Sequence, residues 1–295
     1  MKIAVDAGHG SETPGKRTPP LPVNIDFNKD GKIDVKKGGS IREHTANTGV
    51  ANYLIKELKR CGFDTVQTGF DDENPYNDND TPLAERQGVI KNAKCDYSVC
   101  IHFNASGDGS AFTAPEGLGI YIHDKYNNES EKFAQTVLKY LVKGTVQVNR
   151  GITKQALAMC NCNSLGVKGA ILTELAFMTN QREAVELMGS EDYWKESARE
   201  ICMGICEYTG KNYVEEIIVP TKTITKSSSK DDIRWLQNKL NSVLAGESFI
   251  PLAVNGIYDS KVRIAVLIYW EKRGWNKDGA KDGWSAGTGT IDALK

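Results

Sequence analysis

The chain has 295 residues, of which 37 are basic and 38 acidic, and its net charge is −1. This balance predicts no nucleic-acid partner, and no run approaches the roughly 18 apolar residues that membrane insertion requires. The seven cysteines include no CxxC pair, which favours reduced thiols in the core over a disulfide framework. Asp6 interrupts the apolar start of the chain, so we expect no signal peptide and a cytoplasmic protein.

Short apolar runs alternate with amphipathic stretches in the first two thirds of the chain. The expected strands are residues 2–7, 63–69, 95–102, 117–123 and 169–177. The expected helices are residues 39–62, a helix starting at Thr81 and Pro82, 130–144, and 190–210 with Ser190 as N-cap. Strands that alternate with helices predict an α/β fold, with a mainly parallel twisted sheet flanked by helices.

The sequence changes character after this α/β pattern. Residues 214–230, VEEIIVPTKTITKSSSK, have no helical period and end in a serine run, which is typical of a linker. Residues 231–244 then form an amphipathic pattern with a helical period. We therefore predict a first domain at 1–212, a linker at 213–229 and a small, mainly helical domain at 230–295.

A stretch near the N-terminus imitates a calcium-binding loop. In DFNKDGKIDVKK, Asp26, Asn28, Asp30 and Asp34 occupy ligand positions of an EF-hand loop. The twelfth position requires a bidentate glutamate and holds Lys37 instead. Weak Ca²⁺ binding by these residues is therefore an alternative that we consider less favourable than a polar turn without metal.

Two histidines follow apolar runs at equivalent places. His9 and His102 end the runs KIAVDAGH and SVCIH, and Glu174 ends the run AILTE. The carboxyl ends of parallel strands meet at one edge of a sheet, where ligand sites form. Zinc favours imidazole with carboxylate, and a catalytic zinc keeps three protein ligands and one open position. The residues leave three candidates for the third ligand, namely Glu43, Glu174 and His44.

Four ordered motifs resemble a known family. DAGHG at 6–10, Glu43 at the head of a helix, IHFNA at 101–105 and ILTELAFMTN at 171–180 resemble the zinc-dependent N-acetylmuramoyl-L-alanine amidases of the amidase-3 group. NRGI at 149–152 is similar to an element of the same family. The resemblance covers roughly residues 1–210. The chain departs from the family in a long polar insertion at residues 11–42, which we interpret as a rim of the substrate cleft.

The resemblance implies a role for each matching residue. It implies that His9, Glu43 and His102 bind one Zn²⁺ and that Glu174 is the catalytic carboxylate. It further implies that Asn104 and Arg150 contact the substrate, which would be bacterial peptidoglycan. A carboxylate left off the metal can act as general base, and zinc lowers the pKa of bound water to roughly 7.

The last part of the chain resembles small peptidoglycan-binding domains. DIRWLQNKL and the turn at 255–259 precede a helical pattern, and a second similar turn begins at Asp282. The alternative to wall binding is a small helical domain that only packs on the first domain. Trp235, Trp270, Trp275 and Trp284 offer flat faces for sugars, although a small domain also needs tryptophans in its core.

We therefore expect a peptidoglycan hydrolase that cuts between N-acetylmuramic acid and L-alanine. The absence of an export signal favours a phage endolysin, held in the host cytosol until it is released to act on the wall. The alternatives are a zinc carboxypeptidase or endopeptidase acting on cell-wall peptides, and a non-catalytic wall-binding protein.

Overall fold

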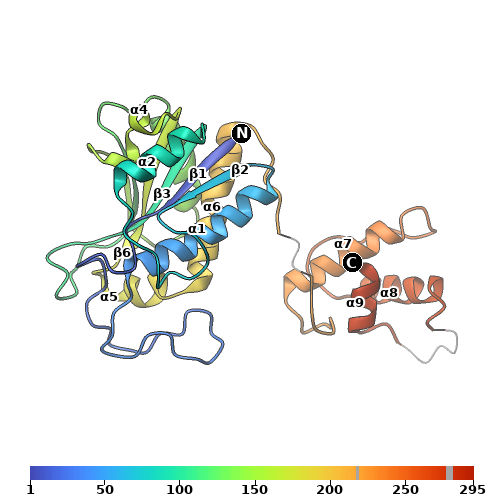
Figure 1. Ribbon diagram of the computed structural model, residues 1–295. Helices are drawn as coiled ribbons and strands as arrows, with labels where there is room; N and C mark the ends of the chain where they lie inside the picture. The colour runs from blue at the N-terminus through green and yellow to red at the C-terminus, as the bar shows by residue number, and fades with distance from the viewer. Residues whose placement is uncertain (217–218, 277–281) are drawn as a thin grey trace. The chain divides into compact units, whose positions relative to one another are not determined.

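The computed structural model describes residues 1–216, 219–276 and 282–295. The chain divides into two compact units, Met1–Val214 and Glu215–Lys295, which are drawn in Figure 1. Residues 217–218 of the predicted linker and 277–281 of the predicted C-terminal domain lie outside the described residues. In the described part of the chain, no helix combines the length and apolarity needed to cross a bilayer.

The first unit is built on one sheet. Its described strands form a six-stranded sheet in the order β2-β1-β3-β6-β4-β5. They are β1 (Lys2–Ala7), β2 (Asp64–Thr68), β3 (Tyr97–Asn104), β4 (Leu118–Ile122), β5 (Asn149–Lys154) and β6 (Gly169–Phe177). β2, β1, β3 and β6 are mutually parallel, whereas β4 runs antiparallel to β6 and β5 runs parallel to β4. The prediction of a mainly parallel sheet is confirmed.

Helices cover both faces of this sheet (Figure 1). The first unit contains α1 (Glu43–Arg60), α2 (Leu83–Asn92), α3 (Ser130–Leu141), α4 (Cys162–Leu165), α5 (Gln181–Glu183) and α6 (Glu191–Thr209), with short helical turns at Ala158–Cys160 and Ala184–Met188. Ile3 and Val5 of β1 pack in one core with α1, α3 and α6. Ala4, between them, packs in a separate core with residues of α2 and α4. This alternation is expected of a strand with both faces buried.

The start of α1 and the capping of α6 differ from the prediction. The helix expected from residue 39 begins at Glu43, because Arg42 is extended and bridges Arg17, and Ile41 is hydrogen-bonded to Thr18. The Ile41 N–H donates to Thr18 Oγ1 at 3.0 Å, and the Thr18 N–H donates to the Ile41 carbonyl at 2.9 Å. Ser190 precedes α6 as predicted, but its side chain makes no capping hydrogen bond.

The edge strand β5 was not predicted from the sequence pattern. Its two central residues are partly buried and the other four are exposed, so it carries no apolar run or clear alternation. Edge strands that are exposed to solvent lack the hydrophobic signal on which strand prediction depends.

The insertion at residues 11–42 is irregular but anchored. Leu21, Ile25, Phe27 and Ile41 are buried in the core shared with α1 and α6. A short bridge joins Ile25 to Val35 within the insertion. The insertion is therefore packed against the first unit through apolar side chains.

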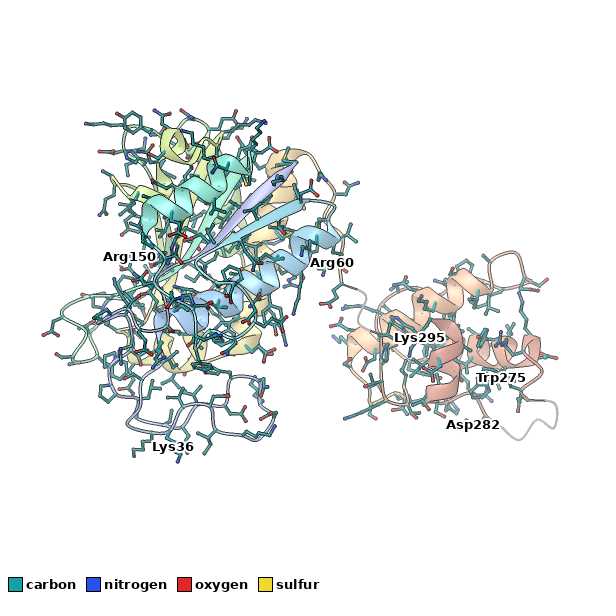
Figure 2. All side chains as sticks on the ribbon, viewed as in Figure 1. Lys36, Arg60, Arg150, Trp275, Asp282 and Lys295 are labelled. Carbon is teal, nitrogen blue, oxygen red and sulfur yellow. The ribbon has the colours of Figure 1, made fainter. Side chains whose placement is uncertain are left out.

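The second unit has a hydrophobic core of its own. Its described helices are α7 (Lys230–Val243), α8 (Ser260–Lys272) and α9 (Thr288–Leu294). The Asp259 side chain caps α8 by accepting from the N–H groups of Lys261 and Val262. Trp235 and Trp270 are buried in the core, whereas Trp275 is 36% exposed and is labelled in Figure 2.

Candidate metal centre and active site

Three of the predicted residues meet at the carboxyl edge of the sheet. His9 follows β1, His102 lies on β3, and Glu43 is the first residue of α1. Glu43 Oε2 lies 3.2 Å from His9 Nε2, and Glu43 Oε1 lies 2.9 Å from His102 Nδ1. The centres of the two imidazole rings are 4.8 Å apart, and the ring planes are nearly perpendicular. All three side chains offer a ligand atom within 4.8 Å of the other two.

The backbone of His9 itself forms the turn after β1 that brings its side chain to this position. Glycine usually supplies the left-handed residue of a sharp turn, but between Gly8 and Gly10 it is His9 that has the left-handed backbone, with φ of 65°. A Cβ on Gly8 would lie 2.1 Å from the His102 ring, and one on Gly10 would lie 2.4 Å from the Asp80 backbone nitrogen. The two glycines are therefore needed for close approach.

Glu43 is almost fully buried and is held as a carboxylate. Burial favours a raised pKa for Glu43, but hydrogen bonds from His102 and His9 outweigh it and lower the pKa well below the usual value. The Phe103 N–H also donates to Glu43 Oε1, at 3.1 Å. Burial favours a lowered pKa for His102, yet the hydrogen bond to Glu43 raises it above its ordinary value.

A buried arginine, which the sequence analysis missed, supports the turn. Arg86 of α2 is 1% exposed and donates to the carbonyl oxygens of Ala7 and His9, each at 2.7 Å. It also donates to the Thr81 carbonyl at 2.8 Å and to Asp6 Oδ1 at 3.2 Å. Arg86 and Ile90 are the buried residues of α2, one helical turn apart. The sequence signal for a buried Arg86 was its position one helical turn before Ile90, on the same face of α2.

The other two histidines do not join the group. His44 is buried, with Nδ1 2.9 Å from the Gly8 carbonyl oxygen and Nε2 2.8 Å from Asp78 Oδ2. One residue along a helix turns the side chain by about 100°, so Glu43 and His44 cannot face the same point. His123 directly follows β4. Because β4 runs antiparallel to β6, His123 lies at the end of the sheet opposite to the one that carries His9 and His102.

Glu174 lies beside the three residues. It is paired in register with His102 across β3 and β6, so both side chains project from the same face. One carboxylate oxygen, Oε2, is buried and has no hydrogen-bond partner among the described residues. Burial raises the pKa of Glu174 to about 8, and the negative charge of Glu43 adds to this while His102 opposes it. An acid–base group needs a pKa near the working pH, and Glu174 meets this condition.

The two residues predicted to bind substrate share a pocket with Glu174. A pocket of about 340 Å³ is lined by Asn104, Arg150 and Glu174, together with side chains of β4 and β5. Arg150, labelled in Figure 2, is exposed and its guanidinium lies 5.0 Å from the centre of the Phe177 ring. The pocket therefore combines a cation, an amide and a carboxyl group beside the histidines.

The residues fit a zinc ion. Tetrahedral zinc with bonds of about 2.0–2.2 Å to nitrogen and oxygen separates its ligand atoms by about 3.4 Å. The nitrogen–oxygen contacts of 3.2 and 2.9 Å, which run to the two different oxygens of Glu43, are somewhat shorter than that spacing, and the three residues each offer a ligand atom within 4.8 Å of the others. Two imidazoles and one carboxylate are a donor set that suits zinc, and they leave a fourth position for a small ligand.

The calcium-like loop forms no comparable group. Asp26 accepts from the N–H groups of Asp30 and Gly31, and Asn28 Oδ1 also accepts from the Asp30 N–H. Asp34 Oδ2 accepts from the Phe27 N–H at 2.8 Å. These oxygen atoms therefore stabilise the turn through backbone hydrogen bonds.

Solved structures share the fold of the first unit. An N-acetylmuramoyl-L-alanine amidase from Clostridium difficile 630 is 22% identical, with a TM-score of 0.54 over 71% of this chain and 97% of that chain. The catalytic domain of CwlV, an amidase from Bacillus (Paenibacillus) polymyxa var. colistinus, is 24% identical, with a TM-score of 0.53 over 72% and 99%. Ami1 from Mycobacterium abscessus is 18% identical, with a TM-score of 0.53 over 71% and 98%.

The family assignment rests on the sequence of the same unit. No curated protein matches this chain in sequence. The Amidase_3 family, described as N-acetylmuramoyl-L-alanine amidase, matches residues 3–207, which include His9, Glu43, His102 and Glu174. Because this match spans more than two thirds of the chain, the protein belongs to the N-acetylmuramoyl-L-alanine amidases of the Amidase_3 family.

Proposed function

We propose that this peptidoglycan amidase is zinc-dependent and uses Glu174 as its general base. Its substrate would be the amide between the lactyl group of N-acetylmuramic acid and the first L-alanine of the stem peptide. The observation that carries the proposal is the meeting of His9, Glu43 and His102 within 4.8 Å, with Glu174 in register beside His102.

In this proposal His9, Glu43 and His102 hold the zinc ion. The bound ion supplies a water of lowered pKa and polarises the scissile carbonyl. One carboxylate and two neutral imidazoles leave a positive charge at the centre, which stabilises negative charge developing on the carbonyl oxygen. The Phe103 N–H donates to Glu43 Oε1 and so holds the Glu43 carboxylate in its orientation.

Glu174 would carry the proton between water and the leaving group. Its Oε2 has no hydrogen-bond partner among the described residues and can accept the proton of the attacking water. The protonated carboxyl group can then donate to the nitrogen of the departing L-alanine. Arg150 and Asn104 would hold the substrate in the pocket that Glu174 lines.

Digestion of purified peptidoglycan tests this function. We expect new L-alanine amino termini without release of D-alanine, and loss of activity when a chelator removes zinc. Glu174→Ala should lower the rate by about 10²–10⁴-fold while keeping its zinc, because it removes only the proton carrier. His9→Ala should lose the zinc itself.

Glu186→Ala, an exposed glutamate in the same unit, should keep full activity. Full-rate digestion by Glu174→Ala would refute the proposed base. Release of D-alanine would indicate a carboxypeptidase, and cleavage inside the stem peptide would indicate an endopeptidase.

We propose that the second unit binds the cell wall. Trp275 supports this role, because it is 36% exposed and the Arg273 guanidinium lies 5.1 Å from its ring centre. An exposed aromatic face beside a cation suits sugars that carry carboxylate-bearing peptides. Trp235 and Trp270, which are buried, serve the core of the unit.

The endolysin role and the cytosolic location stay predictions. Fractionation of a bacterium that expresses the full chain tests them together. We expect the protein in the cytosolic fraction and lysis only after the membrane is permeabilised. Lysis without permeabilisation, with the protein outside the membrane, would contradict both.

A further inference from the structure

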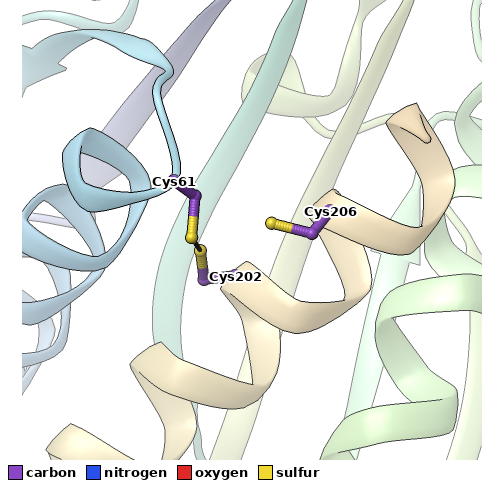
Figure 3. A group of neighbouring side chains, drawn as sticks. All are labelled: Cys61, Cys202 and Cys206. Carbon is purple, nitrogen blue, oxygen red and sulfur yellow. Dashed lines mark hydrogen bonds between the residues drawn. The ribbon is translucent and has the colours of Figure 1, made fainter. Parts of the chain in front are cut away.

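Three cysteines outside the candidate active site bring their sulfur atoms together. Cys202 and Cys206 lie four residues apart on α6 and therefore face the same side of the helix. Cys61 follows the last residue of α1. Figure 3 shows the Cys61 and Cys202 sulfurs facing each other, with the Cys206 sulfur directed toward the pair. The Cys61 and Cys202 sulfurs are 3.8 Å apart, and all three lie within 4.8 Å of one another.

This geometry fits a three-coordinate metal site. Metal–sulfur bonds of about 2.3 Å in a trigonal site separate the sulfur atoms by about 4.0 Å. The sulfurs of the thiol cluster, Cys61, Cys202 and Cys206, need to move by less than about 1 Å to reach that spacing. Among the described residues, the only other group of His, Cys, Asp or Glu that meets the same spacing is His9, Glu43 and His102.

The donor atoms select the kind of metal. The cluster offers sulfur alone, and the nearby Glu57 carboxylate is occupied by the Tyr213 hydroxyl at 2.6 Å. Thiolate ligands select copper(I), zinc and iron–sulfur clusters. Structural zinc and iron–sulfur clusters take four protein ligands, whereas this group offers three, which favours copper(I). We propose that Cys61, Cys202 and Cys206 form a three-thiolate site for a soft metal ion of the copper(I) type.

The surroundings partly offset the negative charge of three thiolates. The Val214 N–H donates to Cys61 Sγ at 3.3 Å. A hydrogen bond from Cys202 lowers the pKa of the Cys206 thiol, and the positive charge of Lys211 lowers it further. The metal must displace the protons of the other thiols, so binding should strengthen as the pH rises.

A short segment gives the metal a route to the buried sulfurs. Residues 211–214 lie outside any helix or strand and run over Cys61. The Val214 carbonyl accepts from Arg60 Nε at 2.8 Å, and the Val214 side chain is 46% exposed. Opening this route requires breaking the hydrogen bonds of Lys211, Tyr213 and Val214 with the end of α1 and the turn after it, and lifting Tyr213 from the core.

Cadmium titration of the reduced, metal-free full-length protein tests the site. Cadmium–thiolate bonds absorb in the ultraviolet, whereas imidazole and carboxylate ligands give no such band, so the zinc centre does not interfere. We expect a saturable thiolate band in the wild-type protein and in His9→Ala. Copper(I) should displace cadmium from the site, which is measured as cadmium released into solution.

Variants and a second measurement complete the test. Cys206→Ser should weaken cadmium binding by at least about tenfold, and Cys95→Ser, a buried cysteine on the other face of the sheet, should not. The cadmium-113 chemical shift of the wild-type protein reports the number of sulfur ligands without any variant. A folded wild-type protein with no thiolate band, a band unchanged in Cys206→Ser, or cadmium that copper(I) cannot displace would overturn the proposal.

Discussion

At the scale of single residues, Glu174 shows how the surroundings set the chemistry of a carboxyl group. Glu43 and Glu174 both lie at the carboxyl edge of the sheet, yet their pKa values shift in opposite directions. Glu43 receives hydrogen bonds from two histidines, whereas burial of Glu174 is not balanced by any such bond. One carboxyl group is thereby suited to bind a cation and the other to exchange protons.

The raised pKa of Glu174 predicts how the stability of the metal-free protein depends on pH. The folded state binds the Glu174 proton up to about pH 8, whereas the unfolded state releases it near 4.5. The stability that this proton contributes is fully present below the unfolded pKa and is lost as the pH rises through about 8. Glu174→Gln, which stays neutral, should therefore become more stable than the wild-type protein by roughly 5 kcal/mol at high pH.

Urea denaturation in a chelator, from about pH 5 to about pH 9, measures this difference. The two proteins should have similar stability at the acidic end and diverge toward the alkaline end. Parallel curves over the whole range would show that Glu174 titrates normally in the folded state.

Gly8 shows how little space the candidate metal centre leaves. A Cβ at this position would lie 2.1 Å from the His102 ring, so Gly8→Ala must displace a proposed ligand. We expect zinc affinity to fall by about tenfold or more and the free energy of unfolding by about 1–3 kcal/mol. Gly88→Ala is the matched control, because nothing lies within 4 Å of its Cβ position in α2. That control should gain up to about 1 kcal/mol; equal zinc affinity in both variants would contradict the close-approach explanation.

At the scale of secondary-structure elements, α2 supports the turn between β1 and the insertion. Arg86 joins the end of β1, the His9 carbonyl and the segment that precedes α2 through donors of a single guanidinium group. The group is buried together with Asp6, whose carboxylate also accepts from the Thr68 hydroxyl at 2.8 Å. A planar guanidinium can reach all these acceptors at once, whereas an ammonium cannot.

Arg86→Met should destabilise the fold and weaken zinc binding together. It leaves Asp6 buried without its cation and removes the donor to the His9 carbonyl, so we expect a loss of about 3–5 kcal/mol. Arg86→Lys should be intermediate. The exposed pair Arg234–Asp231 supplies the control, and Arg234→Met should cost less than about 1 kcal/mol.

Urea denaturation and chelator competition for zinc measure the two effects separately. A folded Arg86→Met variant with wild-type zinc affinity would show that Arg86 stabilises the sheet without positioning His9.

At the scale of the whole molecule, the two units have separate cores. The buried hydrophobic clusters of the first unit end at Cys206, and the cluster of the second unit begins, among the described residues, at Ile224. Each unit can therefore bury its apolar surface within itself, which is the condition for independent folding.

A chain truncated after Val214 should fold and keep amidase activity on a soluble muramyl peptide, with kcat/KM within about threefold of the full chain. It should bind intact cell walls at least about tenfold more weakly, because the proposed wall-binding unit is missing. Co-sedimentation with purified walls measures the binding, and Trp275→Ala in the full chain should weaken it without changing hydrolysis of the soluble peptide. Equal wall binding by the truncated chain would contradict the proposed role of the second unit.

Most of the architecture could be predicted because its signals are local. Strands with both faces buried are continuous apolar runs, so β1, β3 and β6 could be recognised, together with the histidine that follows β1 and the one within β3. The edge strand β5 was missed because exposed residues carry no such pattern. Seven cysteines in the core could be predicted from their spacing, and all seven are buried.

The sequence by itself determined which residue types reach the carboxyl edge of the sheet, since strand and helix periods are properties of neighbouring residues. The residue patterns left Glu43, Glu174 and His44 open as the third ligand, and the family resemblance favoured Glu43. The tertiary structure places Glu43, and not His44, against His9 and His102. It alone brought Arg86 to the His9 carbonyl and Cys61 to the two cysteines of α6. Such contacts join residues far apart in the chain, and their geometry depends on how whole elements pack, which no local pattern records.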